Sequence, residues 1–451
     1  MRFRFLALAL LCSIALSTGA TPSPQTQPQT SPQSSPAALA STANADSTPP
    51  QTKKFTGYSL SPELYKKAKR LAAIRFSFHT FSFVFSLFAL WLTLRLKWSA
   101  KFRDWAERAT QRQFLRGLIY APLFIATLTL LQLPLDLFNE SLLKRYGISV
   151  QPWAAWAGDW GKSLLLSIVI GSMLILILFA VIRRSPRRWW LYFWIISIPI
   201  SLAIFFVEPL VIDPMFSKFE PLSAKAPALI PQLERLTVRG GMPIPPDRMF
   251  WMLASDKTIF TNAYVTGFGA TKRVVIWDTS IDKETTDGIL LMFGHEMGHY
   301  VLFHIPKEMA IYLSLLLVLI YLGYRLAHWM LARWGKPWKI GSLGDWASLP
   351  LLFFILTALT FLATPVFNAI SRHFEHEADR YGVEVIHGIV PSAQQAAARG
   401  FERSGELDLA DPNPSAFMKF WMFDHPTRPE RVHFVATYDP WAKGESPRYV
   451  H

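Results

Sequence analysis

Residues 287–303 read Asp-Gly-Ile-Leu-Leu-Met-Phe-Gly-His-Glu-Met-Gly-His-Tyr-Val-Leu-Phe, with apolar side chains at helical spacing. On such a helix His295 and His299 project from one face about 6 Å apart, which suits two ligands of one metal ion. Glu296 points about 100° to the side, where it can contact a water molecule on the metal as a general base. Gly294 and Gly298 would let a second helix approach closely. The alternative is a core helix whose histidines are merely hydrogen-bonded.

A second polar segment supplies candidates for a third ligand. Residues 368–382 read Asn-Ala-Ile-Ser-Arg-His-Phe-Glu-His-Glu-Ala-Asp-Arg-Tyr-Gly and continue as a helix from an apolar run. Glu375 and Asp379 lie four residues apart on one face, so Glu375 is predicted to bind the metal and Asp379 to orient a ligating histidine. His373 and His376 remain rival ligands, whereas Glu377 points elsewhere. Taken alone, the cluster also fits a solvated charged face.

Together these residues predict a hydrolytic centre with one Zn²⁺ per chain. A catalytic zinc ion takes three protein ligands and keeps a fourth position for water. Zinc in such a site lowers the pKa of its bound water to about 7, and Glu296 would take the proton and return it to the leaving amine of a peptide. The apolar residues 274–277 predict a strand whose edge could pair with an extended substrate.

The composition is that of a membrane protein. The chain has 451 residues, of which 51% are hydrophobic, 14% aromatic and only 17% charged, with a formal net charge of +14. These values exclude a disordered chain and argue against an ordinary soluble enzyme. The basic residues fall between apolar runs, which argues against a nucleic-acid partner. Six apolar runs are long enough to be spans: Phe76–Leu96, Leu115–Phe138, Ser163–Ile182, Trp189–Val211, Met309–Tyr324 and Ala347–Ile370.

The predicted fold is mainly α: a multi-pass helical bundle carrying a divided α+β metalloprotease domain. Residues 1–20, with Arg2, Arg4 and a short apolar stretch, are typical of a signal peptide. Residues 21–57 are predicted to be a flexible low-complexity tether. An N-terminal membrane domain with four spans would cover 58–212, and a peptidase domain 213–451, with spans at about 309–324 and 347–370. The single cysteine, Cys12, excludes a disulfide framework and a thiolate zinc site.

Charge in the short loops bears on sidedness. Alternate loops at 97–116, 183–188 and 325–339 are rich in Lys and Arg and would be cytoplasmic by the positive-inside rule. The polar domain would then lie on the periplasmic side of a bacterial inner membrane. Five basic residues just before the first span argue the other way: Lys66, Lys67, Lys69, Arg70 and Arg75.

At these motifs the chain resembles the type I CAAX prenyl endopeptidases, integral-membrane zinc metalloproteases of the gluzincin type, and looks like a bacterial member. The similarity covers roughly residues 58–435. It includes the segments 209–222, 261–269 and 273–279, the HExxH motif at 295–299, and the acidic motif at 371–379 followed by His425-Pro and Glu430-Arg.

The resemblance implies roles for particular residues. His295, His299 and Glu375 would be the zinc ligands, and Glu296 the catalytic acid–base. Further roles would fall to four residues: Asp379 as an orienter or proton donor, His425 facing the substrate carbonyl, Arg431 bracing the carboxylates, and Asn262 beside the bound peptide. From the residues alone, His425 and Arg431 would equally pass for surface groups.

The family's first span has no full-length counterpart in this sequence. The resemblance implies CAAX-type processing of membrane-associated substrates, whereas the secretion-like N-terminus favours quality control of membrane proteins in a bacterial envelope. Two alternatives from other classes are a multi-pass transporter with a polar cap and a non-catalytic assembly factor with a structural metal. Oligomeric state and cleavage preference do not follow from the sequence.

Overall fold

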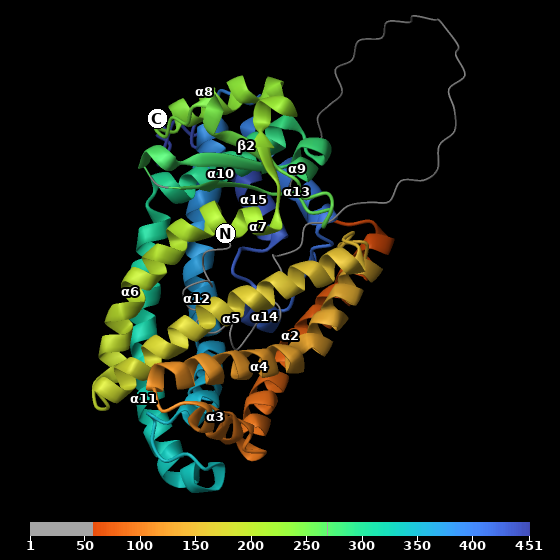
Figure 1. Cartoon of the computed structure of the whole chain (residues 1–451). Helices are drawn as coiled ribbons and strands as arrows, with labels where there is room; N and C mark the ends of the chain where they lie inside the picture. Colours follow the sequence, from red (N-terminus) through yellow and green to blue (C-terminus); the bar gives the residue numbers. More distant parts are fainter. Residues whose placement is uncertain (1–56, 268) are drawn as a thin grey trace, which may run out of the picture.

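Six long helices dominate the structure, a computed structural model that describes residues 57–267 and 269–451 (Figure 1). They are α2 (Pro62–Arg95), α4 (Gln113–Arg145), α5 (Trp153–Arg184), α6 (Trp189–Val207), α11 (His304–Trp338) and α12 (Leu349–Ile386). Each is long and apolar enough to cross a membrane, α6 together with the turns that follow it to Phe216. This confirms the six predicted spans. The predicted signal peptide and nearly all of the predicted tether lie outside the described residues.

The bundle has its own core. Large side chains from α4, α5 and the 3₁₀ turn before α12 meet there, and Phe179 lies 4.5 Å from Trp346 between ring centroids. The short helix α3 (Trp98–Ala109) packs beside this core. There the Ser99 hydroxyl lies 2.5 Å from the Tyr120 hydroxyl and 3.1 Å from the carbonyl oxygen of Ala347. Polar side chains buried in a bundle need such partners because no water is available to them.

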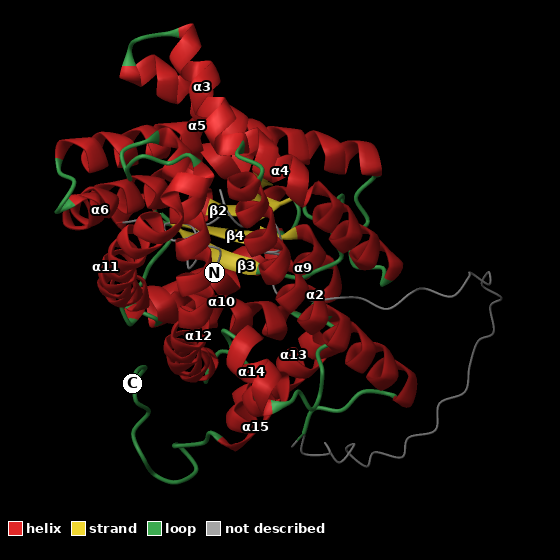
Figure 2. Ribbon diagram, turned by 90° about the horizontal axis from the view of Figure 1, so that it is seen from below, coloured by secondary structure: helices red, strands yellow, loops and turns green. Residues whose placement is uncertain are grey.

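A four-stranded sheet lies at the opposite end, in the order β1-β2-β4-β3. The strands are β1 (Phe219–Pro221), β2 (Met249–Met252), β3 (Ala263–Thr266) and β4 (Arg273–Trp277). Strands β2 and β4 pair in parallel, while β1 with β2 and β3 with β4 are antiparallel. Viewed from below, the strands lie in the middle of the surrounding helices (Figure 2).

The sheet order corrects one prediction. The strand at 274–277 forms, but it was expected to offer a free edge and instead pairs with β2 on one side and β3 on the other. Its side chains from Val274 to Trp277 are all buried. An uninterrupted run of β-branched apolar residues is typical of a central strand, which is buried on both faces. Edge strands usually carry charged residues or proline. The pattern that predicted a strand at 274–277 therefore already argued against an edge position. The edge strand on this side is β3.

Seven further helices lie between residues 213 and 437, before and after the last two spans. They are α7 (Asp213–Phe216), α8 (Ile230–Arg239), α9 (Asp278–Lys283), α10 (Thr286–Val301), α13 (Ala393–Leu407), α14 (Ala416–Met422) and α15 (Arg428–Thr437). Helices α8, α10, α13 and α15 pack with the sheet and the end of α12 around one apolar core. Segments before and after the last two spans thus form one body.

Glycines set the distance between α10 and α12. A Cβ atom added at Gly294 would lie 2.7 Å from Val385 Cγ1, and one at Gly298 would lie 3.2 Å from Ala378 Cα. On the opposite helix, a Cβ at Gly382 would lie 3.1 Å from the backbone nitrogen of His295. The predicted role of the two α10 glycines in close helix approach is therefore confirmed, and the contact brings residues 295–299 against residues 375–382.

Candidate metal centre

Helix α10 carries the two histidines of the HExxH motif. It begins at a proper cap, because the Thr285 hydroxyl accepts a hydrogen bond of 3.1 Å from the Gly288 backbone. One turn apart, His295 and His299 are 5% and 7% exposed, and their Nε2 atoms lie 3.3 Å from each other. The two buried imidazoles thus direct their Nε2 atoms at one point.

Glu375 on α12 completes the group. Its Oε2 atom lies 3.2 Å from His295 Nε2, and its Oε1 atom lies 3.4 Å from His299 Nε2. Ligand atoms that lie about 2.05 Å from a tetrahedral zinc ion are about 3.4 Å from one another. The three separations between these atoms therefore fit zinc. Imidazole nitrogen and carboxylate oxygen are also donors that zinc binds. Within the described residues, His295, His299 and Glu375 are the group whose ligand atoms could hold a metal.

Asp379 and Arg431 lie behind His295. The Asp379 carboxylate accepts from His295 Nδ1 at 2.8 Å and from Arg431 Nε at 2.9 Å. All three side chains are buried, and the Arg431 guanidinium lies 4.1 Å from the centre of the Phe401 ring. Burial lowers the pKa of His295, but hydrogen bonds to Asp379 and Glu375 outweigh burial and raise this pKa to about 9 in the metal-free site.

Helix α15 holds Arg431 in place. The Thr427 hydroxyl and the Glu430 carboxylate form a reciprocal capping box at its first turn. Arg431 is the fourth residue of this helix and its first buried side chain. From the residues alone Arg431 would equally pass for a surface cation, because nothing local shows that α15 packs beside α12, and its expected role in bracing the carboxylates came from the family resemblance.

Glu296 directly follows His295 on α10 and is half-buried. In residues 57–267 and 269–451, no hydrogen bond or ion pair holds its carboxylate. A carboxylate without a protein partner beside a metal site is available to a water molecule, as a general base must be.

His425 and Asn262 have different surroundings. His425 comes from the loop between α14 and α15, with Nε2 at 3.3 Å from Glu375 Oε2 and Nδ1 at 2.6 Å from Asp424. Ser371 and Arg372 of α12 bind backbone carbonyls of this loop. Asn262 directly precedes β3, and its backbone N–H donates to the Ser280 hydroxyl at 2.7 Å. The fold thus brings His425 to the centre and places Asn262 at the start of the edge strand.

The rival ligands lie away from the centre. The His373 side chain is 70% exposed, and His376 packs on the Phe434 ring at 4.2 Å between centroids. Glu377 faces His304, whose Nδ1 atom lies 3.3 Å from His299 Nδ1. Sequence analysis missed His304. It follows His299 by five residues, a spacing that places it off the shared face of a continuous helix.

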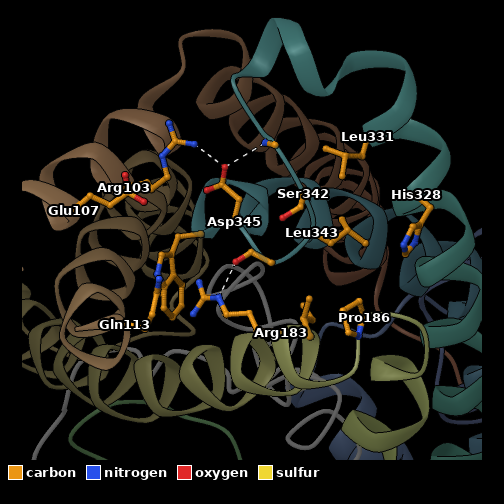
Figure 3. Close-up of a pocket in the computed structure, with 14 residues that line it drawn as sticks. Arg103, Glu107, Gln113, Arg183, Pro186, His328, Leu331, Ser342, Leu343 and Asp345 are labelled. Carbon is orange, nitrogen blue, oxygen red and sulfur yellow. Dashed lines mark hydrogen bonds and ion pairs between the residues drawn. The ribbon is translucent and has the colours of Figure 1, made fainter. Parts of the chain in front are cut away.

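A separate cavity of about 710 Å³ lies at the other end of the bundle (Figure 3). Its wall includes Arg103, which pairs with Asp345 at 2.6 Å, and Arg183, whose Nε donates to the Gly344 carbonyl at 2.8 Å. None of the residues predicted to form the metal site lines this cavity. The candidate metal site therefore lies apart from this cavity.

Comparison with known proteins identifies the family. A family model described as CAAX prenyl protease N-terminal, five membrane helices, matches residues 40–218, and one for peptidase family M48 matches residues 223–439. A Bacillus subtilis protein named uncharacterized metalloprotease YhfN is 32% identical over 86% of this chain and 90% of its own length. The chain belongs to peptidase family M48. This M48 peptidase is therefore a membrane protein of a metalloprotease family, and the resemblance found in the sequence is confirmed.

Eukaryotic relatives and a solved structure extend the comparison. CAAX prenyl protease 1 of Saccharomyces cerevisiae is 26% identical over 70% of this chain and 71% of its own length. The crystal structure of S. mikatae Ste24p matches with a TM-score of 0.72 at 22% identity, over 87% of this chain and 92% of the other. The M48 peptidase shares that fold, which confirms the predicted fold class. The matching N-terminal model has five membrane helices, and the described part of residues 40–218 holds four.

Proposed function

We propose that this M48 peptidase is a zinc metalloendopeptidase that cleaves peptide bonds in membrane-associated or hydrophobic proteins. The observation that carries the proposal is the buried triangle of two Nε2 atoms and one carboxylate, with sides of 3.3, 3.2 and 3.4 Å. His295, His299 and Glu375 would hold one Zn²⁺ per chain. When bound, zinc supplies a Lewis acid that makes a water molecule nucleophilic at neutral pH.

Glu296 is the proposed general base and acid. Its carboxylate has no protein partner in the described residues, so it can accept a proton from the attacking water. The same carboxyl group then donates that proton to the amine of the departing peptide. Asp379 lies on the far side of His295, which favours an orienting role over proton donation.

His425 is proposed to contact the substrate. Asp424 accepts from its Nδ1 atom at 2.6 Å, which fixes the ring and leaves Nε2 directed at the metal site. With a proton on Nε2, His425 would donate a hydrogen bond to the substrate oxygen as negative charge develops there. Arg431 would not contact the substrate and would instead hold Asp379 against His295.

The open edge of β3 is the proposed platform for the substrate backbone. One side of this strand pairs with β4, and α10 packs beside it. The Tyr300 hydroxyl donates to the Val265 carbonyl of β3 at 3.2 Å, which ties the strand to the zinc helix. An extended peptide could add to this edge near Asn262, whereas β4 has no free edge.

The membrane setting supports a proposal for the substrate class and the location. We propose hydrophobic segments of bacterial membrane proteins as substrates, in preference to prenylated CAAX proteins, with the bilayer and the peptide as the partners of this chain. The basic segments 97–116, 183–188 and 325–339, which include helix α3 and the end of α11, lie at the end of the bundle away from the sheet (Figure 1). By the positive-inside rule this end is cytoplasmic, which would place the metal site at the periplasmic face of the inner membrane.

The deciding experiment compares wild type with Glu296→Gln, both purified in detergent. The variant should keep its zinc, because Glu296 is not a ligand, while cleavage of a quenched hydrophobic peptide should fall by about 10²–10⁴-fold. Equal cleavage by both proteins would remove the assigned base. If neither protein cleaves or binds zinc, the transporter reading gains support, and zinc binding without cleavage would favour the assembly factor.

A further inference from the structure

A sharp turn after the zinc helix brings His304 to the back of the metal site. Helix α10 ends at Val301, Phe303 adopts a left-handed conformation with φ of 56°, and α11 begins at His304. The Phe303 side chain is 66% exposed, while His304 is fully buried. Such a backbone conformation is unfavourable for a residue other than glycine and persists where its surroundings hold it.

His304 lies between a candidate zinc ligand and a carboxylate. Its Nδ1 atom lies 3.3 Å from His299 Nδ1, and its Nε2 atom lies 3.4 Å from Glu377 Oε2 without a well-aligned hydrogen bond. Because His299 presents Nε2 to the metal position, its proton must be on Nδ1. His299 then donates to His304 Nδ1, and the remaining proton of His304, on Nε2, faces Glu377.

The C-terminal tail reaches the same carboxylate. The Tyr449 hydroxyl donates to Glu377 Oε1 at 2.8 Å. Two turns further along α12, the fully buried Glu384 accepts from the backbone N–H groups of three consecutive tail residues, Arg448, Tyr449 and Val450, at 2.9, 2.6 and 3.0 Å. A buried carboxylate that binds three N–H groups fixes the tail firmly against α12. This tail lies beyond the family match, which ends at residue 439.

We propose that His304 positions His299 for metal binding, and that the C-terminal tail supports His304 through Tyr449 and Glu377. This inference rests on the proposed zinc site and adds to it a support that ends in the C-terminal tail, beyond the residues that the M48 family model matches. The chain of contacts runs from His299 on α10 through His304 on α11 to Glu377 on α12 and then to the tail. Metal-ligating histidines are commonly fixed in this way by a partner on the second ring nitrogen.

Packing alone would be the simpler role for His304. Its ring lies 4.8 Å from the Phe374 ring between centroids, so an imidazole could be present only to fill space. The two roles separate by substitution. An asparagine at this position keeps an oxygen near the place of Nδ1 but fills less space, whereas leucine fills space and offers no acceptor.

The test uses the full-length protein in detergent, with His304→Asn, His304→Leu and His373→Gln. His373 also lies near Glu377, at 3.8 Å, but is exposed and does not contact His299. Zn²⁺ affinity is measured by chelator competition, and Co²⁺ is added to read the ligand geometry from its visible absorption. We expect His304→Leu to lose about 10–100-fold in Zn²⁺ affinity with an altered Co²⁺ spectrum, and His304→Asn to recover most of the loss. His373→Gln should match wild type.

Wild-type affinity and spectrum in folded His304→Leu would overturn the proposal, as would a leucine variant that outperforms the asparagine variant. Should His304→Leu fail to fold, His304→Ala takes its place as the variant without an acceptor, and it should show the same loss of affinity and altered Co²⁺ spectrum while His304→Asn and His373→Gln stay near wild type. Both measurements concern metal binding and need no cleavage. They therefore fail or succeed separately from the Glu296→Gln test of peptide hydrolysis.

Discussion

His295 and His299 lie one helical turn apart, yet the groups behind them differ. His295 donates directly to Asp379, a buried carboxylate that Arg431 holds from the other side. His299 reaches its carboxylate, Glu377, only through His304. The first arrangement is enclosed in the core, whereas Glu377 is 16% exposed and is also contacted by the tail. One candidate ligand thus has a rigid support, and the other has a support open to solvent and to the end of the chain.

The largest expected effect is that of Asp379→Ala. Removing this carboxylate leaves the Arg431 guanidinium buried without its partner, which typically costs about 3–5 kcal/mol of stability. Asp379→Asn is the matched variant, because it keeps an oxygen acceptor for His295 and loses only the charge. Thermal unfolding of the metal-free proteins measures the cost. An Asp379→Ala protein as stable as wild type would contradict the assignment of the rigid support.

The second largest effect concerns the pH dependence of stability, which should differ between the support of His295 and that of His299. In the metal-free protein the pKa of His295 is raised to about 9, above an unfolded value of about 6.5. Its protonation therefore contributes stability that is fully present below about pH 6.5 and is lost as pH rises through about 9. The metal-free protein should have a lower Tm at high pH, while Zn²⁺, which competes with this proton, should bind better there.

The same Asp379→Asn variant sharpens this comparison. Removing the negative charge beside His295 should reduce the difference in Tm between low and high pH, whereas Glu377→Gln should leave that difference nearly unchanged. Differential scanning calorimetry at several pH values with a chelator present gives both numbers. A pH response unaffected by Asp379→Asn would place the titrating group elsewhere.

Glu377→Gln should have a smaller effect on the site itself. The amide can still accept from Tyr449, but it no longer offers a charge to His304, so we expect Zn²⁺ affinity to fall by about tenfold. Stability should change little because the side chain is partly exposed. Chelator competition is the measurement, and a loss larger than that of Asp379→Ala would reverse the ranking of the two supports.

Tyr449→Phe should show the smallest effect. It removes one hydroxyl, which donates to Glu377, and leaves the three backbone N–H groups that bind Glu384. We expect a reduction in Zn²⁺ affinity of about two- to fivefold, in line with the loss of one hydrogen bond of about 0.5–1 kcal/mol. Deletion of residues 448–451 removes the hydrogen bond to Glu377 and those to Glu384, and it should lower the Zn²⁺ affinity more than Tyr449→Phe does. Equal affinity in all three proteins would exclude the tail from the support.

Much of the fold and of the centre could be predicted from local patterns. Apolar runs of about twenty residues predicted the six spans, because only a helix satisfies its backbone within the bilayer. The i and i+4 spacing placed His295 and His299 together, and Glu375 with Asp379 followed from a second helical face. The edge strand could not be read in this way, since strand order depends on partners far away in the chain. The actual edge, β3, begins beside Asn262.

His304 and Arg431 show where local patterns end. No spacing rule connects His304 to His299, because the contact depends on a left-handed turn at Phe303 and on the start of a new helix. Arg431 lies 52 residues from Asp379 and meets it only because α15 packs against α12. Both contacts arise from the packing of separate helices, and packing is not periodic in the sequence.

The sequence by itself determined the membrane-spanning bundle and singled out four candidate residues of the metal site, His295, Glu296, His299 and Glu375. These depend on hydrophobic length and helical periodicity, which are properties of neighbouring residues. Only the tertiary structure decided which carboxylate supports which histidine, which strand is free, and where the chain's last residues lie. Those features depend on distances between helices far apart in the chain, and these distances are fixed by close packing at glycines and by burial of charge next to its partner.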